Sequence, residues 1–292
     1  MSAPLPQATF ETLANLLKAR SGLAIGTDKT YLLETRLGTI LKQEKLPDLT
    51  ALAARLRGPA EDALARAVVE AMTTNESFFF RDEKPFQHFR EYALPKLIAA
   101  RPAGSTIRIW SAASSSGQEA YSLAMIVQEC RATLGDRRVE IIGTDISQEQ
   151  VVRARDGLYS QFEVQRGLPM QMLVKYFRKD ALNWRVNDAL RAMVQFREFN
   201  LLADLRGLGG FDIVFCRNVL IYFDAPTKGR ALDAIARQMP ADGLLYLGGA
   251  ETVMGISARF ATHGTERGVY VLAPPAAPVM APASRLAVAS GN

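Results

Sequence analysis

The stretch that decides the fold is Arg108-Ile-Trp-Ser-Ala-Ala-Ser-Ser-Ser-Gly-Gln-Glu-Ala-Tyr-Ser122. A predicted strand ends in a loop of small residues, and a helical pattern opens directly after it. In a doubly wound α/β fold, such a turn lets the backbone approach a ligand at the carboxyl end of the sheet. The loop is neither G-x-G-x-x-G nor a Walker-type loop, which disfavours a pyrophosphate and favours a ligand without phosphates. Taken alone, the stretch fits a β–α turn that packs for its own sake equally well.

Short β-rich runs alternate with helical segments around this loop. The strands are predicted at Ile107–Trp110, Val139–Thr144, Val194–Phe199, Phe211–Phe215 and Leu244–Leu247. The helices are predicted at Glu119–Leu134, Ser147–Asp156 and Pro226–Met239. Ser147 followed by Gln150 resembles a capping box, and Asp145 closes the second strand, where a carboxylate can accept from ribose hydroxyls. The alternation predicts a mostly parallel sheet with helices on both faces.

The hydrophobic pattern and the composition divide the chain into further segments. Residues 1–94 show only helical periodicity and predict a small all-α domain, followed by a linker at 95–105. The α/β domain is predicted over 106–273, with an insertion near 157–193 where the alternation fits poorly. Residues 274–292 are rich in Ala, Pro and Ser and predict a disordered tail.

Composition argues against several classes of function. Cys130 and Cys216 lie far apart, and the remaining zinc-ligand candidates are His88 and His263, so no metal site is predicted. The N-terminus lacks the pattern of a signal peptide, and no stretch reaches 18 uninterrupted apolar residues. The net charge of +5 is spread along the chain, which favours ordinary surfaces over a nucleic-acid partner and leaves an acidic protein partner open.

Three segments together resemble the CheR family of chemotaxis-receptor glutamate O-methyltransferases. They are Thr73-Thr-Asn-Glu-Ser-Phe-Phe-Phe-Arg-Asp82, Trp110–Ser122, and Phe211-Asp-Ile-Val-Phe-Cys-Arg-Asn-Val-Leu-Ile-Tyr-Phe-Asp224. They are similar to that family's T-T-N-E-T-x-F-F-R-D, W-S-A-x-x-S-x-G-E-E-P-Y-S and F-D-x-I-F-C-R-N-V-x-I-Y-F patterns. This chain departs from the patterns at Ser77, Gln118 and Ala120, none of which removes a group assigned to chemistry.

The resemblance implies a Rossmann-like methyltransferase domain with a small β-subdomain insertion, and S-adenosylmethionine as the cofactor. The implied cofactor-binding residues are Asn75, Ser77, Arg81, Glu119, Asp145, Asn200, Leu201, Arg217 and Asn218. Within this set, Glu119 is expected at the cofactor's amino-acid end, Asp145 at its ribose, and Asn200-Leu201 beside its adenine. Arg81 and Tyr222 form the implied catalytic pair.

The implied reaction needs no general base, because a glutamate carboxylate is already ionised at neutral pH. Alignment of the reacting atoms is what helps, and Arg81 is expected to orient the substrate carboxylate. Simpler readings stand beside these roles. Phe78–Phe80 would be core, Arg217 would pair with a carboxylate, and Cys216 would be an inert packed thiol.

The expected partner is the helical bundle of methyl-accepting chemotaxis receptors in the cytoplasm, met through Lys29, Arg36, Lys42 and Lys45. Independence from a receptor's C-terminal pentapeptide is expected, because Tyr176–Val186 is short and lacks glycine. Two alternatives stay open: a non-catalytic cofactor-binding adaptor, and a methyltransferase for another substrate. A nucleic-acid amine methyltransferase is disfavoured, because Cys216-Arg-Asn-Val stands where such enzymes carry Asn/Asp-Pro-Pro-Tyr/Phe.

Overall fold

A computed structural model describes residues 5–58 and 61–274, so the predicted tail from 275 onward lies outside the described residues. The N-terminal part is a helical bundle of α1 (Gln7–Ser21), η1 (Thr27–Lys29), α2 (Thr30–Gln43), α3 (Leu49–Leu56) and α4 (Asp62–Met72). Its core includes Leu13, Leu33, Leu52 and Val68, all essentially inaccessible to solvent. None of the helices in the described ranges has the length and apolar character that a bilayer crossing demands.

The second part is built on a sheet with the order β6-β2-β1-β7-β8-β10-β9. The bounds are β1 (Thr106–Ala112), β2 (Arg138–Asp145), β6 (Val194–Glu198), β7 (Ile213–Cys216), β8 (Leu244–Leu247), β9 (Phe260–Thr262) and β10 (Val269–Leu272). The first five strands in that order run parallel, whereas β10 is antiparallel to β8 and β9. The predicted strands are confirmed to within about two residues at their ends, and so is the α/β fold class.

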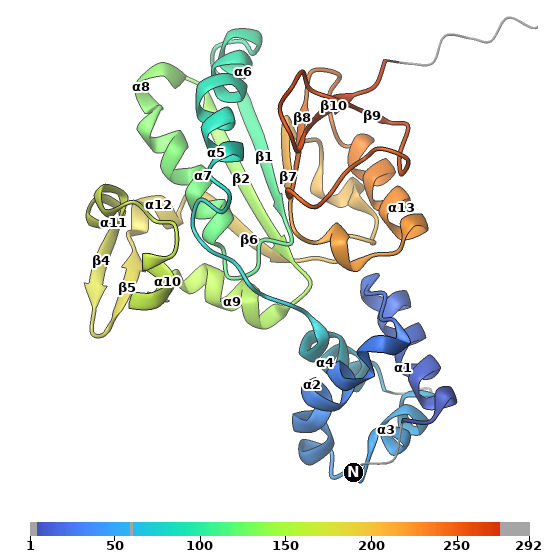
Figure 1. Cartoon of the computed structure of the whole chain (residues 1–292). Coiled ribbons are helices and arrows are strands. Elements are labelled where there is room, and N and C mark those ends of the chain that lie inside the picture. Colours follow the sequence, from blue (N-terminus) through green and yellow to red (C-terminus); the bar gives the residue numbers. More distant parts are fainter. Residues whose placement is uncertain (1–4, 59–60, 275–292) are drawn as a thin grey trace, which may run out of the picture.

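Helices cover both faces of this sheet (Figure 1). One face carries α5 (Lys84–His88), the π-helix η2 (Phe89–Ala93), α6 (Leu94–Ala100), α7 (Gln118–Glu129), α8 (Arg131–Leu134) and α9 (Gln148–Asp156). The other face carries η3 (Leu205–Leu208), η4 (Leu220–Tyr222) and α13 (Ala225–Ala236). In β7, Ile213 and Phe215 pack into the core under α5–α9, and Val214 and Cys216 pack into the core under α13. This alternation follows from the two-residue repeat of a strand.

Residues 84–94 were predicted to belong to the helical domain and 95–105 to a linker, but the structure packs these residues against the sheet. Phe86, Phe89 and Leu97 are buried in the core of the sheet, whereas the bundle's own core ends at Met72. The helical pattern was read correctly, but periodicity does not say which core a helix covers. The segment assigned as a linker includes most of helix α6 (Leu94–Ala100).

The predicted insertion forms a separate small unit. It holds an antiparallel sheet of order β3-β5-β4, with β3 (Leu158–Ser160), β4 (Phe177–Asp180) and β5 (Asn183–Val186). The helices α10 (Gln161–Gln165), α11 (Met170–Tyr176) and α12 (Asp188–Arg191) accompany it. Gly167 lies against the Thr73–Asp82 segment so closely that a Cβ at this position would overlap the carbonyl oxygen of Phe79. The β-subdomain therefore packs directly on one of the three motifs.

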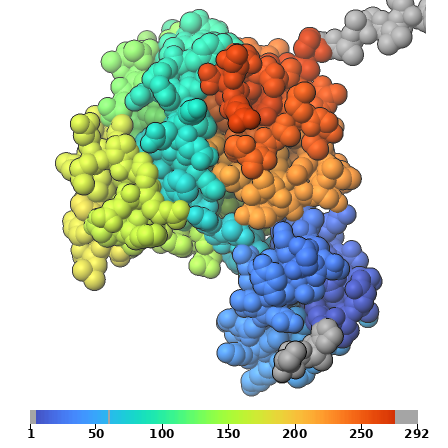
Figure 2. All heavy atoms as spheres, viewed as in Figure 1, coloured from blue at the N-terminus to red at the C-terminus, as the bar shows by residue number. Residues whose placement is uncertain are grey.

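The helical bundle forms a separate lobe (Figure 2), which lies at the carboxyl end of the sheet (Figure 1). Helix α1 ends at Gly22, whose φ of 79° is left-handed and whose Cβ would lie 2.8 Å from the Phe223 ring. The amide of Ala24 donates to the carbonyl of Tyr222 at 2.9 Å, and Lys18 pairs with Asp224 at 2.6 Å. These contacts fix the C-terminal end of α1 beside the third motif.

Candidate active site

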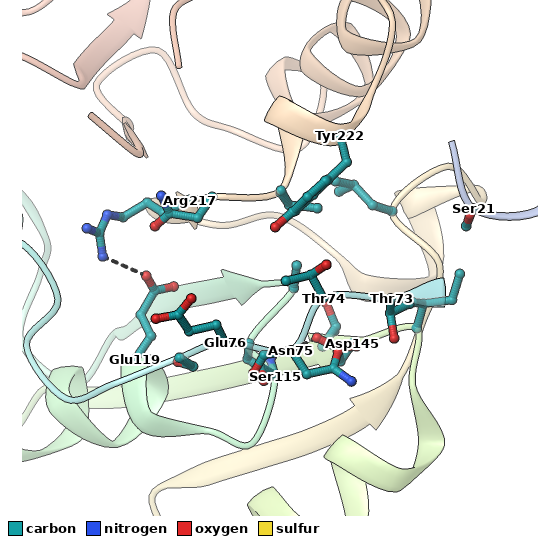
Figure 3. Close-up of a pocket in the computed structure, with 18 of the residues that line it drawn as sticks. Ser21, Thr73, Thr74, Asn75, Glu76, Ser115, Glu119, Asp145, Arg217 and Tyr222 are labelled. Carbon is teal, nitrogen blue, oxygen red and sulfur yellow. Dashed lines mark hydrogen bonds and ion pairs between the residues drawn. The ribbon is translucent and has the colours of Figure 1, made fainter. Parts of the chain in front are cut away.

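A pocket opens at the carboxyl ends of β1, β2 and β7, where the strand order reverses on either side of β1. Open parallel sheets bind their ligands at such a switch point. The pocket encloses about 1040 Å³ including its open mouth, and the bundle closes one side with Ser21, Leu23 and Met72. All ten sequence-predicted site residues line it: Asn75, Ser77, Arg81, Glu119, Asp145, Asn200, Leu201, Arg217, Asn218 and Tyr222. Figure 3 shows several of them facing one cavity.

Asp145 lies at the end of β2 and organises the small-residue loop. Its Oδ2 accepts from the Ser115 amide at 2.8 Å, and its Oδ1 accepts from the Ser147 amide at 2.9 Å. Burial raises the pKa of this carboxyl, although both backbone bonds favour its charged form. Because the Ser147 amide is already taken, Gln150 does not complete the predicted capping box; only the Ser147 hydroxyl caps α9, accepting from the Gln150 amide at 3.2 Å.

The loop after β1 is strained and close-packed. Ala113 and Ser115 have φ values of 55° and 49°, which non-glycine residues rarely adopt. Gly117 has a φ of 94°, and a Cβ there would lie 2.9 Å from the Phe196 ring. Glycine is therefore required at 117 so that helix α7 can start directly behind the pocket.

Glu119, in the first turn of α7, is linked to Arg217 across the pocket floor. Its Oε2 accepts from Arg217 Nη1 at 3.0 Å, and its Oε1 accepts from the Ser111 hydroxyl at 2.8 Å. Burial raises the pKa of the Glu119 carboxyl, and the nearby Arg217 charge opposes that shift. The side chain of Arg217 is only 1% exposed and also donates to Asp82 Oδ2 at 2.6 Å. Arg217 thus pairs with carboxylates and lines the site at the same time.

Arg81 lines the pocket and is partly exposed, and its guanidinium has no carboxylate partner among the described residues. It donates to the carbonyl of Glu76 at 3.2 Å and lies 5.1 Å from the centre of the Phe78 ring. Its carbonyl accepts from Arg217 Nη2 at 2.8 Å, which fixes its backbone. Phe78 lines the pocket and Phe79 is fully buried, so the core interpretation of this aromatic run is wrong for Phe78.

The opposite end of the pocket depends on the helical bundle. Asn200 donates from Nδ2 to the Arg20 carbonyl at 2.6 Å and accepts from the Leu202 amide at 2.9 Å. Beside it, the apolar side chains of Ile146, Phe199 and Leu201 line the pocket. The Tyr222 ring projects into the cavity from the facing wall (Figure 3).

Several lining residues escaped the sequence analysis. Ser21 and Leu23 reach the pocket only through domain packing, and Ile146 and Phe199 carry no motif of their own. Glu251 was also missed, although it binds the backbone of the third motif from outside the pocket. The sequence around Glu251 gives no sign of this role, because its partners are backbone amides, which do not depend on residue type. Cys216 is fully buried, which raises the pKa of its thiol and agrees with an inert packed residue.

The residues present suit a nucleoside that carries an amino-acid end. Buried carboxylates at Asp145 and Glu119 can accept from hydroxyls and from an ammonium group. Among the described residues, three buried side-chain atoms have no hydrogen-bond partner: Ser114 Oγ, Gln150 Oε1 and Arg217 Nε. Ser114 and Arg217 line the pocket, where a ligand or water can supply the partner. The apolar side chains beside Asn200 suit the faces of a purine. S-adenosylmethionine has all of these features, so the donor set fits it.

Comparison with known proteins agrees with this reading. Residues 8–73 match the family model "CheR methyltransferase, all-alpha domain", and residues 75–269 match "CheR methyltransferase, SAM binding domain". The chain is 39% identical over 251 residues to chemotaxis protein methyltransferase Cher2 of Pseudomonas putida, covering 85% of this chain and 91% of that one. It is 41% identical over 250 residues to chemotaxis protein methyltransferase 1 of Pseudomonas aeruginosa, covering 84% and 90%.

A third relative, the chemotaxis protein methyltransferase of Vibrio anguillarum, is 38% identical over 256 residues, covering 86% of this chain and 91% of that one. The two family models follow the structural division into bundle and α/β domain, and the relatives are matched over most of their length. With the pocket geometry, these matches show an enzyme that uses S-adenosylmethionine, and the chain belongs to the CheR methyltransferase family.

Proposed function

We propose that this enzyme methylates glutamate side chains on the helical bundle of chemotaxis receptors, in the cytoplasm where that bundle lies. The observation that supports the proposal is the division of the pocket. Asp145 and Glu119 are buried carboxylates in its lining, whereas the partly exposed Arg81 has no carboxylate partner among the described residues. That arrangement leaves a cation available for an anionic substrate group, as a glutamate is.

The floor of the pocket would hold the cofactor. Asp145 would accept from ribose hydroxyls, using the lone pairs that its two backbone bonds leave free. Glu119 would pair with the ammonium of the amino-acid end, and Asn200 with Leu201 would flank the adenine. Arg217 and Asn218 would support the cofactor from the β7 side, and Asn75 with Ser77 would border its methionine end. When bound, S-adenosylmethionine supplies an electrophilic methyl group on a sulfonium.

The mouth of the pocket would orient the substrate. A glutamate carboxylate is ionised at neutral pH, so no residue of the chain has to remove a proton. Arg81 would direct one carboxylate oxygen through its planar fork, and Tyr222 would border the reacting centre. Well-oriented reactants can gain roughly 7–11 kcal/mol from alignment, so positioning suffices as the main catalytic effect.

Receptor contact is proposed through the exposed lysines of the bundle, Lys29, Lys42 and Lys45. Arg36 was expected in this set, but its guanidinium is occupied. It donates to the carbonyls of Met72 and Thr73 at 2.7 and 3.0 Å, and to the Thr74 hydroxyl at 3.1 Å. Arg36 therefore supports the pocket, and receptor contact through exposed lysines should weaken as salt increases.

Independence from a receptor pentapeptide tether is the finer part of the proposal. Strands β4 and β5 are joined through Ala181 and Leu182 alone, and Ala181 has a φ of 51°. Such a tight, glycine-free turn offers little room for an added strand to extend past the sheet edge. Titration of a pentapeptide with the receptor's terminal sequence should show no binding at micromolar concentration. Micromolar affinity would reject this part.

The deciding experiment is methyl transfer from labelled S-adenosylmethionine to receptor-bearing membranes. Label that is released as methanol by mild base would indicate a carboxyl methyl ester. Base-stable label, or label on nucleic acid, would favour a different acceptor. Cofactor binding without any transfer would favour the adaptor alternative.

A further inference from the structure

We propose that Glu251 is the positioning residue for the β7 wall of the active site. It follows β8 and is not among the pocket-lining residues, yet its carboxylate accepts four backbone amides. Oε2 accepts from Asn218 at 2.8 Å and from Gly248 at 2.7 Å. Oε1 accepts from Val219 at 3.0 Å and from Ile221 at 3.2 Å. Four donors converging on one carboxylate form an anion-binding nest that the chain fills with its own side chain.

The amides that Glu251 accepts belong to an irregular turn. Strand β7 ends at Cys216, Asn218 has a φ of 59°, and only one 3₁₀ turn follows at Leu220–Tyr222. The amides of Asn218, Val219 and Ile221 therefore lack the ladder partners that a strand or an α-helix would supply. Since buried donors need partners, the Glu251 carboxylate determines which shape this turn takes.

That turn carries one wall of the pocket. Its lining residues are Arg217, Asn218, Val219, Tyr222 and Phe223. Arg217 and Tyr222 come from this wall and face the Glu119 and Asp145 side across the cavity (Figure 3). Glu251 touches no reacting group in this arrangement. It acts through the placement of the Arg217–Tyr222 wall relative to the opposite wall.

The chain also packs closely around this carboxylate. Gly248 cannot be larger, because a Cβ there would lie 2.8 Å from both Asn218 Nδ2 and Glu251 Oε2. Glu251 is only 9% exposed, so water cannot readily replace its oxygens. A glutamine in its place would present one acceptor oxygen, and its NH₂ group would meet two amide donors. Two of the four amides would then lose their acceptor oxygen.

The consequence for catalysis is specific. Asp145 and Glu119 lie on strand β2 and helix α7, so the cofactor contacts proposed for them do not depend on Glu251. The support proposed for Arg217 and Asn218 does depend on it, so a small loss of cofactor affinity is expected. The substrate alignment proposed for Tyr222, and the position of Arg217, also depend on Glu251. Glu251→Gln should therefore lower kcat at least about tenfold while changing the S-adenosylhomocysteine Kd by no more than about threefold.

The test uses the full chain with Glu251→Gln, and Glu266→Gln as a charge-matched control at an exposed glutamate of the same C-terminal segment. The kcat is counted per S-adenosylhomocysteine-binding site, so that a misfolded fraction does not enter it. Hydrogen exchange should accelerate at the amides of Asn218, Val219, Ile221 and Gly248 and stay unchanged in β1 and α7. Glu251→Asp keeps the charge on a shorter side chain, so its kcat and its exchange rates should fall between those of the parent and those of Glu251→Gln.

Unchanged exchange at those amides would overturn the proposal, as would a kcat within about twofold of the parent or a Kd that weakens in step with kcat. If the glutamine variant does not fold, Glu251→Asp carries the same measurements with the same criteria. The kcat arm rests on the proposed receptor substrate. The hydrogen-exchange and cofactor-binding measurements do not. If the parent enzyme fails to methylate receptors, the proposed substrate is rejected, and these two measurements still test the role of Glu251.

Discussion

Asp145→Asn is the perturbation that tests the pocket most directly. The carboxylate of Asp145 accepts the amides of Ser115 and Ser147 at 2.8 and 2.9 Å, and is proposed to accept ribose hydroxyls as well. Asparagine keeps one acceptor oxygen and replaces the other with an NH₂ group that cannot accept. An alanine variant is less informative, because it would leave both backbone donors unpaired.

The expected losses can be worked from these bonds. Losing one hydrogen bond to a charged group costs about 1.5–3 kcal/mol, which corresponds to roughly ten- to 150-fold weaker cofactor binding. One buried amide left unpaired should also lower the free energy of unfolding by about 1–3 kcal/mol. Calorimetry with S-adenosylhomocysteine measures the first effect, and urea unfolding measures the second.

The matched control is Asp156→Asn, which changes an exposed carboxylate at the end of α9, the helix that follows Asp145, and should change neither quantity. A folded Asp145→Asn variant with affinity within about threefold of the parent would remove Asp145 from the cofactor site. Loss of stability without loss of affinity would leave it only the structural role seen in its two backbone bonds.

The remaining predictions concern three other side chains. Arg81→Ala should abolish methylation with little change in S-adenosylhomocysteine affinity, and Arg81→Lys should stay poor because the planar fork is lost; near-normal turnover in either would make Arg81 structural. Burial raises the pKa of Glu119, so it should take up a proton at a higher pH than an ordinary glutamate. Affinity measured by calorimetry should then fall as pH is lowered through that pKa, and Glu119→Gln should bind weakly without this pH dependence; identical pH profiles would exclude Glu119. Arg36→Ala should weaken cofactor binding severalfold through the lost bonds to Met72, Thr73 and Thr74, whereas Lys42→Ala should raise only the KM for receptor. Equal cofactor affinity in the two variants would contradict the supporting role of Arg36.

Much of the architecture was predictable because it follows from strand order. Loops at the carboxyl ends of parallel strands meet at one edge, so the segments after β1, β2 and β7 had to gather there. The chain fulfils this, and residues from all three segments line one pocket. Helix existence was equally readable from periodicity, including α9 with its cap at Ser147.

Partner choice was not predictable, because it depends on backbone geometry that no motif records. Asp82 could have paired with its neighbour Arg81, but φ values of 67° and 43° at Asp82 and Glu83 turn the chain so that Asp82 meets Arg217. Arg36 lies in a basic pattern typical of a partner-binding face, and only the packing of α2 against the segment after α4 shows that it binds carbonyls. Ser21 reaches the pocket only because the C-terminal end of α1 packs against Phe223.

Side chains in and around this pocket hold strained backbone in place. Three non-glycine residues with positive φ donate their amides to side chains: Phe80 to Ser122 Oγ at 3.0 Å, Ser115 to Asp145 at 2.8 Å, and Asn218 to Glu251 at 2.8 Å. Such a conformation costs on the order of 1–3 kcal/mol and persists only where its surroundings determine it. Each acceptor side chain therefore stabilises a conformation that the backbone alone disfavours.

This link predicts thermodynamic coupling between a strained residue and its acceptor. In a double-mutant cycle of Ser115→Gly and Asp145→Asn, glycine removes the strain at 115, so Asp145→Asn should destabilise the glycine background less than the parent. The coupling free energy should exceed about 0.5 kcal/mol in urea unfolding, the level at which neighbouring sites cease to be additive. The lost bond from the Ser115 hydroxyl to the Asn75 carbonyl cancels in the cycle, because both glycine variants lack it. Additive effects would mean that the carboxylate does not hold the loop in its left-handed conformation, and that its bond to the Ser115 amide is incidental to the shape of the pocket.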